Sequence, residues 1–186
     1  MTQLDLTTGI TPENAAEAAE GKLIKNSVRK ITGISIDTRT INSGDLFVAV
    51  RGENTDGHRF VAKAAEAGAS TVLISDPEAV SGITADCSAI LVSDTVAALG
   101  KLAKAHKAEL DVLTVAVTGS VGKTTTRQFI YAVLSQEMKT HRTEGNFNNE
   151  LGLPLSVMKL DGSFRASVLE MGMSAKGEIS YLTGIV

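Results

Sequence analysis

The stretch that most constrains the fold of this chain is residues 113–126, which read LTVAVTGSVGKTTT. Residues 113–117 are mostly apolar on both alternating faces, which is typical of a parallel strand covered by helices on each side. Gly119 and Gly122 then allow a tight turn, and the residues after them open a helix. A strand, a glycine loop and a helix in this order predict an α/β fold with a mainly parallel sheet.

The same loop has the residue types of a phosphate-binding site. Its backbone N–H groups would point at an anion, the Lys123 ammonium would contact the β- and γ-phosphates of ATP, and the Thr124 hydroxyl would ligate Mg²⁺. The spacing departs from the general pattern, because Val117 stands where that pattern has its first glycine. An ordinary strand-to-helix turn with a surface lysine is the alternative interpretation. The expected ATP-binding residues are Gly119, Ser120, Val121, Gly122, Lys123, Thr124 and Thr125.

Residues 124–136 are predicted to form the helix that follows the loop. Phe129, Ile130, Val133 and Leu134 have the i, i+1, i+4, i+5 spacing of one apolar stripe, so we predict that these four side chains face the sheet. Because strand, loop and helix arrive in the required order, the context favours the phosphate site over the ordinary turn.

A carboxylate is expected at the same edge of the sheet. Residues 167–171 form a further apolar strand that ends near Glu170. The carboxyl ends of parallel strands face the crevice where such sheets bind ligands, so Glu170 is predicted to reach the metal held by Thr124. A carboxylate solvated at a strand end is the alternative. The segment at residues 144–155 is rich in asparagine and glycine, which indicates either a loop with hydrogen-bonding groups fixed beside a helix start or an ordinary polar turn before a helix.

The first part of the chain is predicted to form a small α/β domain of its own. Short apolar strands alternate with helical segments as far as residue 109, and the pattern restarts at residues 110–112. We therefore expect domains at residues 1–110 and 111–186. A strand predicted at residues 31–36 leads directly into Asp37, Thr38 and Arg39, which form either a solvated turn or a binding segment.

Composition argues against several classes of protein. The 186 residues carry a net charge of −3 and only 4% aromatic residues, so we expect no binding of nucleic acid. No apolar run is long enough to span a membrane and the first ten residues lack the layout of a signal peptide, so a cytoplasmic protein without membrane insertion is expected. Cys87 is the only cysteine, which leaves no intrachain disulfide and no cysteine cluster for zinc. We interpret it as a passive thiol.

Five segments taken together resemble the Mur ligase family. They are ISIDTR at 34–39, GDLFVA at 44–49, TGSVGKTT at 118–125, GNFNN at 145–149 with GLPL at 152–155, and LEMG at 169–172 with KGEI at 176–179. The first three are similar to Mur ligases in general. The last two are similar to the members that add D-alanyl-D-alanine. The resemblance covers nearly the whole chain.

This resemblance implies a substrate domain at residues 1–110 that holds a UDP-sugar peptide, and the first part of an ATPase domain from residue 111. It implies that ATP, with Mg²⁺, phosphorylates the terminal carboxylate of UDP-MurNAc-tripeptide and that the amine of D-alanyl-D-alanine then attacks the acyl phosphate. The expected catalytic residues are Lys123 and Glu170, and the expected metal ligands are Thr124 and Glu170. The expected substrate-binding residues are Ser35, Asp37, Thr38, Arg39, Asn146 and Asn149.

Full-length members of this family continue through a metal-binding histidine, a carbamylated lysine and a carboxyl-terminal domain. We therefore expect this chain to be a fragment of the ligase, monomeric and inactive by itself. Two other interpretations are a non-catalytic module that binds nucleotide or UDP-sugar, and a different amide ligase of the folylpolyglutamate or cyanophycin synthetase type. Binding of UDP-MurNAc-tripeptide or of folate would distinguish these alternatives.

Overall fold

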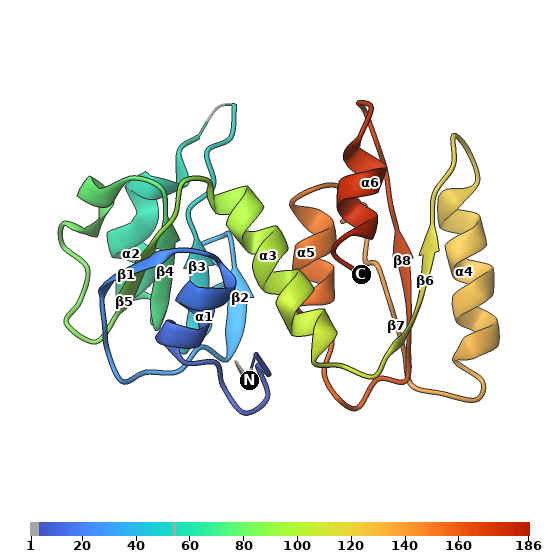
Figure 1. Cartoon of the computed structure of the whole chain (residues 1–186), viewed down its shortest axis with the longest axis horizontal. Coiled ribbons are helices and arrows are strands. Elements are labelled where there is room, and N and C mark those ends of the chain that lie inside the picture. The colour runs from blue at the N-terminus through green and yellow to red at the C-terminus, as the bar shows by residue number, and fades with distance from the viewer. Residues whose placement is uncertain (1–3, 54) are drawn as a thin grey trace. The chain divides into compact units, whose positions relative to one another are not determined.

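The computed structural model describes residues 4–53 and 55–186 and is α/β, as the sequence predicts (Figure 1). The chain divides into two compact units, and the division falls between Leu102 and Ala103. This point lies inside helix α3, Thr95–Ala108, whereas the sequence predicted a boundary just after that helix. Each unit is built on a sheet of its own. Within the described residues, no helix is both long and apolar enough to cross a membrane.

The first unit contains a five-stranded sheet in the order β1-β5-β4-β3-β2. Strands β2 to β5 are parallel, while β1 pairs antiparallel with β5. The strands are β1 (Lys22–Lys25), β2 (Gly33–Ser35), β3 (Asp45–Val48), β4 (Thr71–Ile74) and β5 (Ser88–Leu91). The helical segments beside α3 are α1 (Pro12–Ala18), η1 (Gly57–Phe60), α2 (Val61–Glu66) and η2 (Pro77–Val80).

The core of this unit is centred on β3 and β4, which are buried at every position. Phe47 lies opposite Val72 in the sheet register, and both pack with Val61 of α2. Strands that are buried along their whole length are covered on both faces, as in other parallel sheets. Cys87 belongs to the same cluster. Burial raises the pKa of its thiol to about 11, which agrees with a passive thiol.

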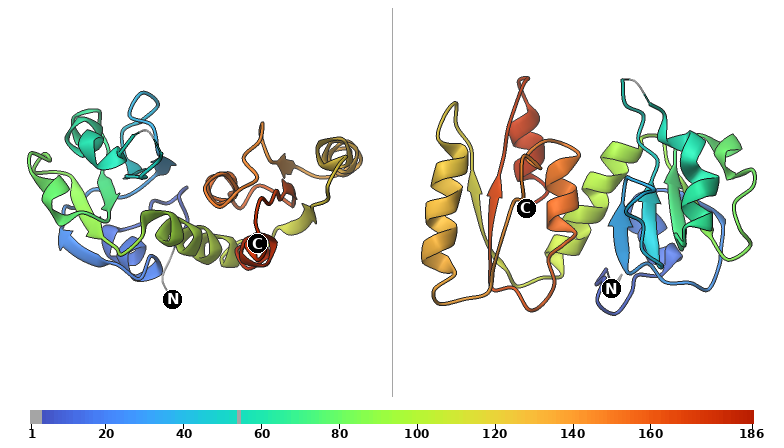
Figure 2. Two further views of the ribbon diagram at one scale, coloured as in Figure 1. Left: turned by 90° about the horizontal axis from the view of Figure 1, so that it is seen from above. Right: turned by 180° about the vertical axis from the view of Figure 1, so that it is seen from behind.

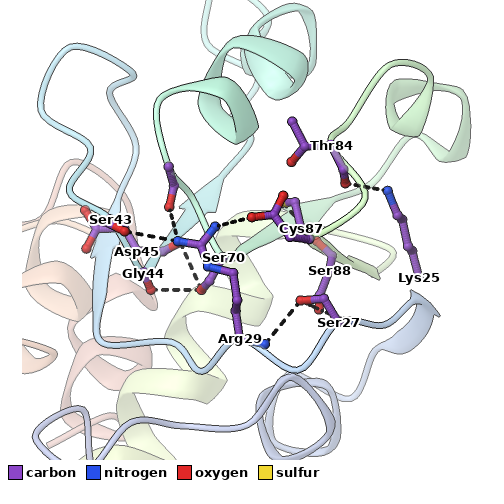
Figure 3. Close-up of polar contacts among 12 residues, drawn as sticks. Lys25, Ser27, Arg29, Ser43, Gly44, Asp45, Ser70, Thr84, Cys87 and Ser88 are labelled. Atoms are coloured by element: carbon purple, nitrogen blue, oxygen red, sulfur yellow. Dashed lines mark hydrogen bonds and ion pairs between the residues drawn. The ribbon is translucent and has the colours of Figure 1, made fainter.

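Arg29 ties together the loops that precede three parallel strands of this unit (Figure 3). Its Nη1 lies 3.1 Å from Asp86 Oδ2, before β5. Its Nη2 donates to Ser43 Oγ at 3.1 Å, before β3, and to the carbonyl of Gly68 at 2.9 Å, before β4. The amino ends of the strands are therefore held by one side chain. The predicted binding segment that begins at Ser35 lies at the opposite, carboxyl end of β2.

The second unit contains three parallel strands in the order β6-β8-β7 (Figure 2). They are β6 (Leu113–Val117), β7 (Thr140–Arg142) and β8 (Ala166–Glu170), and the helices are α4 (Lys123–Leu134), α5 (Gly152–Val157) and α6 (Glu178–Thr183). Because the strands run in one direction, their carboxyl ends lie at one edge of the sheet. The loops that follow Val117, Arg142 and Glu170 all start at that edge.

Helix α4 does not present the stripe that the sequence predicts. Phe129 and Val133 are each 70% exposed, so the prediction that they face the sheet is wrong. Beyond Lys123 at its start, the less exposed residues of the helix follow the spacing i, i+3, i+4, i+7 instead, and they are Arg127, Ile130, Tyr131 and Leu134. The prediction failed because it counted only apolar residues, whereas the most buried position of the stripe holds an arginine.

Strand β6 is also less covered than predicted. It lies at an edge of the sheet and, among the strands that the structure describes, pairs only with β8. Leu113 is 57% exposed, and Ala116 is exposed as well. Strand β8, in the centre, is buried at every position. The sequence predicted cover on both faces of β6, but in the structure it is β8 that is buried along its whole length.

Candidate phosphate and metal site

The loop that joins β6 to α4 turns sharply at two glycines. Gly119 has a φ of +149° and Gly122 a φ of +80°, and both values favour glycine. A Cβ on Gly122 would meet nothing within 4 Å, so backbone conformation rather than lack of space requires glycine there. The carbonyl of Gly122 accepts a hydrogen bond from the N–H of Thr126 at 2.9 Å. The N–H groups of Lys123, Thr124 and Thr125 come before this first helical bond, so they are the ones available to an anion.

Lys123 is the first residue of α4 and lies over this loop. Its ammonium donates to the carbonyl of Gly119 at 2.7 Å. The charge of the lysine and the positive end of the helix dipole therefore meet at one place. A phosphate group is the kind of anion that such an arrangement binds.

The carboxylate of Glu170 stands at the carboxyl end of β8, and the residue is only 3% exposed. Its Oε2 accepts a hydrogen bond from Thr124 Oγ1 at 3.0 Å, and its Oε1 accepts one from Asn148 Nδ2 at 3.0 Å. Its backbone N–H donates to Thr143 Oγ1 at 2.9 Å. Since these partners come from α4 and from the segment after β7, the position of the carboxylate is fixed from several sides.

A buried arginine neutralises this carboxylate. Arg127 Nη1 lies 3.2 Å from Glu170 Oε2, and both side chains are 4% exposed. The same Nη1 donates to the carbonyl of Gly145 at 3.2 Å. The Nε atom of Arg127 is buried and has no hydrogen-bond partner among the described residues. Removing two charges from water is costly, and their direct contact offsets that cost together with the hydrogen bonds from Thr124 and Asn148 and to Gly145.

The oxygens of Thr124 and Glu170 fit a hard cation such as Mg²⁺. This ion is usually held by one or two carboxylates together with water and substrate phosphates. Thr124 Oγ1 and Glu170 Oε2 are 3.0 Å apart beside the glycine loop, which matches that donor set. Within residues 4–53 and 55–186, no group of three or more histidine, cysteine, aspartate or glutamate side chains could hold a metal ion.

A cavity of about 470 Å³ lies beside Lys123 in the same unit. Its walls come from the α4 start, from the asparagine-rich loop and from the segment between β8 and the end of α6. They include Lys123, Asn148, Asn149, Ser174, Glu178 and Tyr181. The carboxylate of Glu178 accepts a hydrogen bond from the backbone N–H of Ser174 at 2.7 Å, which lowers its pKa. The cavity thus has polar walls next to the candidate phosphate site.

In the first unit, the predicted binding segment forms a compact polar turn after β2. Ser35 Oγ donates to the carbonyl of Asp37 at 3.0 Å and accepts from its N–H at 3.1 Å. Arg39 Nε and Nη2 donate to the carboxylate of Asp37 at 3.0 and 2.6 Å. These bonds lower the pKa of the Asp37 carboxyl to about 2. The Arg39 side chain is 83% exposed, and Thr38 lies half-buried between the two charged residues.

Two family models match the chain. The model described as "Mur ligase middle domain" matches residues 117–186, and the one described as "Mur ligase family, catalytic domain" matches residues 30–107. The chain belongs to the Mur ligase family. The glycine loop and Glu170 of this Mur ligase chain fall within the first match, and the polar turn at Asp37 falls within the second.

Curated relatives of the Mur ligase chain carry the name UDP-N-acetylmuramoyl-tripeptide–D-alanyl-D-alanine ligase. The relative from Bacillus subtilis is 45% identical over 175 residues, which are 93% of this chain and 38% of the relative. The relative from Escherichia coli is 35% identical over 155 residues, which are 83% of this chain and 33% of the relative. The Mur ligase chain therefore spans about a third of the length of these relatives.

Solved structures of MurF proteins match the fold of the Mur ligase chain. A crystal structure of MurF from Acinetobacter baumannii matches with a TM-score of 0.83 and 34% identity, over 95% of this chain and 38% of that one. A structure of MurF from Thermotoga maritima in complex with ADP matches with a TM-score of 0.74 and 34% identity, over 83% of this chain and 35% of that one.

The structure of the Mur ligase chain brings together Lys123, Thr124 and Glu170 at one edge of the second sheet. Asn149 lines the cavity, and its Oδ1 accepts a hydrogen bond from the N–H of Gly152 at 2.8 Å at the start of α5. Asn146 is exposed in the same loop. The roles of these residues toward ligands remain predictions. Gly119, Ser120, Val121 and Gly122 of the glycine loop are exposed, and so are Thr124 and Thr125 in the first turn of α4.

Three side chains that hold Glu170 in this Mur ligase unit were missed by the sequence analysis. Asn148 belongs to the GNFNN segment, but only its neighbours Asn146 and Asn149 were predicted to contact a ligand. Thr143 was given no role, although its hydroxyl accepts a hydrogen bond from the backbone N–H of Glu170. Arg127 belongs to no sequence motif, and only its position on the buried side of α4 indicates a role in the site.

Proposed function

We propose that this chain supplies the nucleotide site and the UDP-sugar unit of a cytoplasmic, monomeric ligase that joins D-alanyl-D-alanine to UDP-MurNAc-tripeptide with ATP. The names of the curated relatives support the two substrates. The ADP complex of the Thermotoga maritima protein supports the nucleotide. The observation that carries the proposal is the 3.0 Å contact of Thr124 with Glu170 beside a glycine loop and Lys123.

The proposed reaction consists of two transfers. The terminal carboxylate of UDP-MurNAc-tripeptide attacks the γ-phosphorus of ATP, the bond from that phosphorus to the bridging oxygen breaks, and an acyl phosphate and ADP form. The amine of D-alanyl-D-alanine then attacks the acyl carbon and loses a proton, and inorganic phosphate leaves as the amide forms. No protein nucleophile is needed, so the work of the chain is positioning and neutralisation of charge.

Within the second unit, we assign Lys123 and the N–H groups of residues 119–125 to the phosphates of ATP. Thr124 and Glu170 would hold Mg²⁺, which when bound supplies positive charge to the phosphate oxygens. Lys123 has two roles here, since it binds the phosphates and neutralises charge that develops on the transferred group. Asn146 and Asn149 are assigned to the substrate, and the position of Asn149 in the cavity beside Lys123 supports this.

Within the first unit, we assign the UDP-sugar peptide to the polar turn of Ser35, Asp37, Thr38 and Arg39. The exposed guanidinium of Arg39 supports this assignment, because an arginine binds phosphate oxygens with the same forked geometry that it uses on Asp37. A diphosphate would compete with Asp37 for these donors.

We further propose that the 186-residue chain binds ligands but does not form the product. Acyl transfer requires the phosphorylated carboxylate and the incoming amine to be held together, and this positioning supplies a large part of the rate. A mixture of the chain with ATP, Mg²⁺, UDP-MurNAc-tripeptide and D-alanyl-D-alanine should release no phosphate above background. Sustained phosphate release that depends on the dipeptide would contradict this expectation.

The nucleotide site is tested with Lys123→Ala. A charge-assisted hydrogen bond contributes about 1.5–3 kcal/mol, so this variant should bind ADP with Mg²⁺ roughly 10- to 150-fold more weakly by titration calorimetry. Lys104→Ala is the matched control, because Lys104 is an exposed lysine of the same unit away from the loop. Equal ADP affinity of the Lys123→Ala variant and the control would overturn the assignment of the loop to phosphate.

A further inference from the structure

Arg127 is a charged side chain that the proposed chemistry does not use. It is 4% exposed, on the side of α4 where the other inward positions hold Ile130, Tyr131 and Leu134. Its Nη1 contacts Glu170 Oε2 and the carbonyl of Gly145, both at 3.2 Å, while its buried Nε has no partner among the described residues. Burying a cation with an unsatisfied donor costs free energy. We therefore ask what the contact of Arg127 with Glu170 Oε2 does for that carboxylate oxygen.

The oxygen in contact with Arg127 is the one that would also face a cation. Thr124 Oγ1 donates its proton to Glu170 Oε2, and Arg127 Nη1 lies against the same atom. A divalent cation between Thr124 and Glu170 has to displace the proton that Thr124 donates. It also has to sit close to the guanidinium, where two positive charges repel each other in a setting with little water.

We infer that Arg127 is a positioning residue that keeps Glu170 from binding a divalent cation until the phosphates of a nucleotide are present. This inference rests on the proposed nucleotide and metal site. Phosphates beside Lys123 bring negative charge that offsets the repulsion between the cation and Arg127. Bound nucleotide then raises the affinity of the site for the cation, and bound cation raises its affinity for the nucleotide by the same factor. The contact with Gly145 holds the guanidinium in place while the cation enters.

The test measures the binding of Mn²⁺ alone to the full chain, without nucleotide, by electron paramagnetic resonance. Arg127→Met removes the charge and keeps an apolar side chain of similar length, so Mn²⁺ should bind about tenfold more tightly than to the unmodified chain. Arg127→Lys keeps the charge and should bind Mn²⁺ as weakly as the unmodified chain. Arg142→Met is the matched control, since the Arg142 guanidinium lies 4.2 Å from the ring centre of Tyr131 and should not affect Mn²⁺ affinity.

Adding Glu170→Gln to Arg127→Met should abolish the tighter binding, which locates Mn²⁺ at this carboxylate. Equal Mn²⁺ affinity of the Arg127→Met and unmodified chains would overturn the inference. Loss of the circular dichroism signal of Arg127→Met, both with and without Mn²⁺, would also overturn it, because the role would then be structural. ADP binding in the presence of Mn²⁺ is measured on the unmodified chain as well. If that binding is absent, the proposed function fails; if it is present and Arg127→Met does not tighten Mn²⁺ binding, only this inference fails.

Discussion

Replacement of Glu170 by glutamine should lower the free energy of unfolding of the second unit by about 3 kcal/mol. The side chains of Glu170 and Arg127 are both 4% exposed and 3.2 Å apart, so water screens their contact very little. Loss of one partner leaves the other charge buried and unpaired, which typically costs about 3–5 kcal/mol. Glutamine still offers a carbonyl oxygen to the donor groups of Thr124 or Asn148, and for this reason we take the lower end of that range.

Urea unfolding of four chains, followed by far-ultraviolet circular dichroism, measures this contribution. The chains are the unmodified protein, Glu170→Gln, Arg127→Met and the double variant. The double variant leaves neither charge unpaired. Its loss of unfolding free energy should therefore be about 2 kcal/mol smaller than the sum of the losses of the two single variants. The same cycle on the exposed pair Lys159 and Glu144, with side chains 51% and 63% exposed, should give a coupling below about 1 kcal/mol. Additive losses at Arg127 and Glu170 within about 0.5 kcal/mol would refute the reasoning.

Three further predictions concern single positions. Gly122→Ala should destabilise the chain by about 1 kcal/mol and weaken ADP binding, because a φ of +80° strains any residue with a Cβ; unchanged melting temperature and ADP affinity would contradict this. The Asp37 carboxyl should titrate near pH 2 by carbon NMR, and because this pKa lies below the usual 3.8, its contribution to stability should be present above about pH 4 and lost as the pH falls toward 2. Arg39→Ala should return the titration midpoint toward 3.8, and an unmoved midpoint would exclude Arg39 as the cause of the shift. Cys87, which is fully buried with a pKa of about 11, should react with a thiol reagent only after unfolding, and rapid labelling of the native chain would disprove its burial.

The class of fold was predictable from local patterns, because a glycine loop between an apolar strand and a helix fits few architectures. Strand β4, Thr71–Ile74, is one of the short apolar strands expected in the first part of the chain. The orientation of α4 was not predictable in this way. An apolar stripe at Phe129 and Val133 has the same period as the true stripe through Arg127, and only the sheet selects between them.

The candidate site was predictable in part. Glu170 and Thr124 were paired on the argument that parallel strands end at one edge, and the two side chains are in contact. That argument places strand ends but says nothing of residues in the middle of a helix or a loop. Arg127 and Asn148 contact Glu170 because of how α4 and the asparagine-rich loop pack against β8, and this packing has no counterpart in short-range sequence patterns.

The ring of contacts around Glu170 also bears on how the second unit acquires its structure. Thr124, Asn148 and Arg127 supply donors for the carboxylate from the protein itself, and the backbone N–H of Glu170 uses the hydroxyl of Thr143. In small domains built around a structural metal, the polypeptide stays unfolded until the ion arrives. Here the carboxylate of Glu170 has its partners within the protein, so we expect a newly made chain to reach its native state in a solution without nucleotide and to meet its ligand with the binding site already formed.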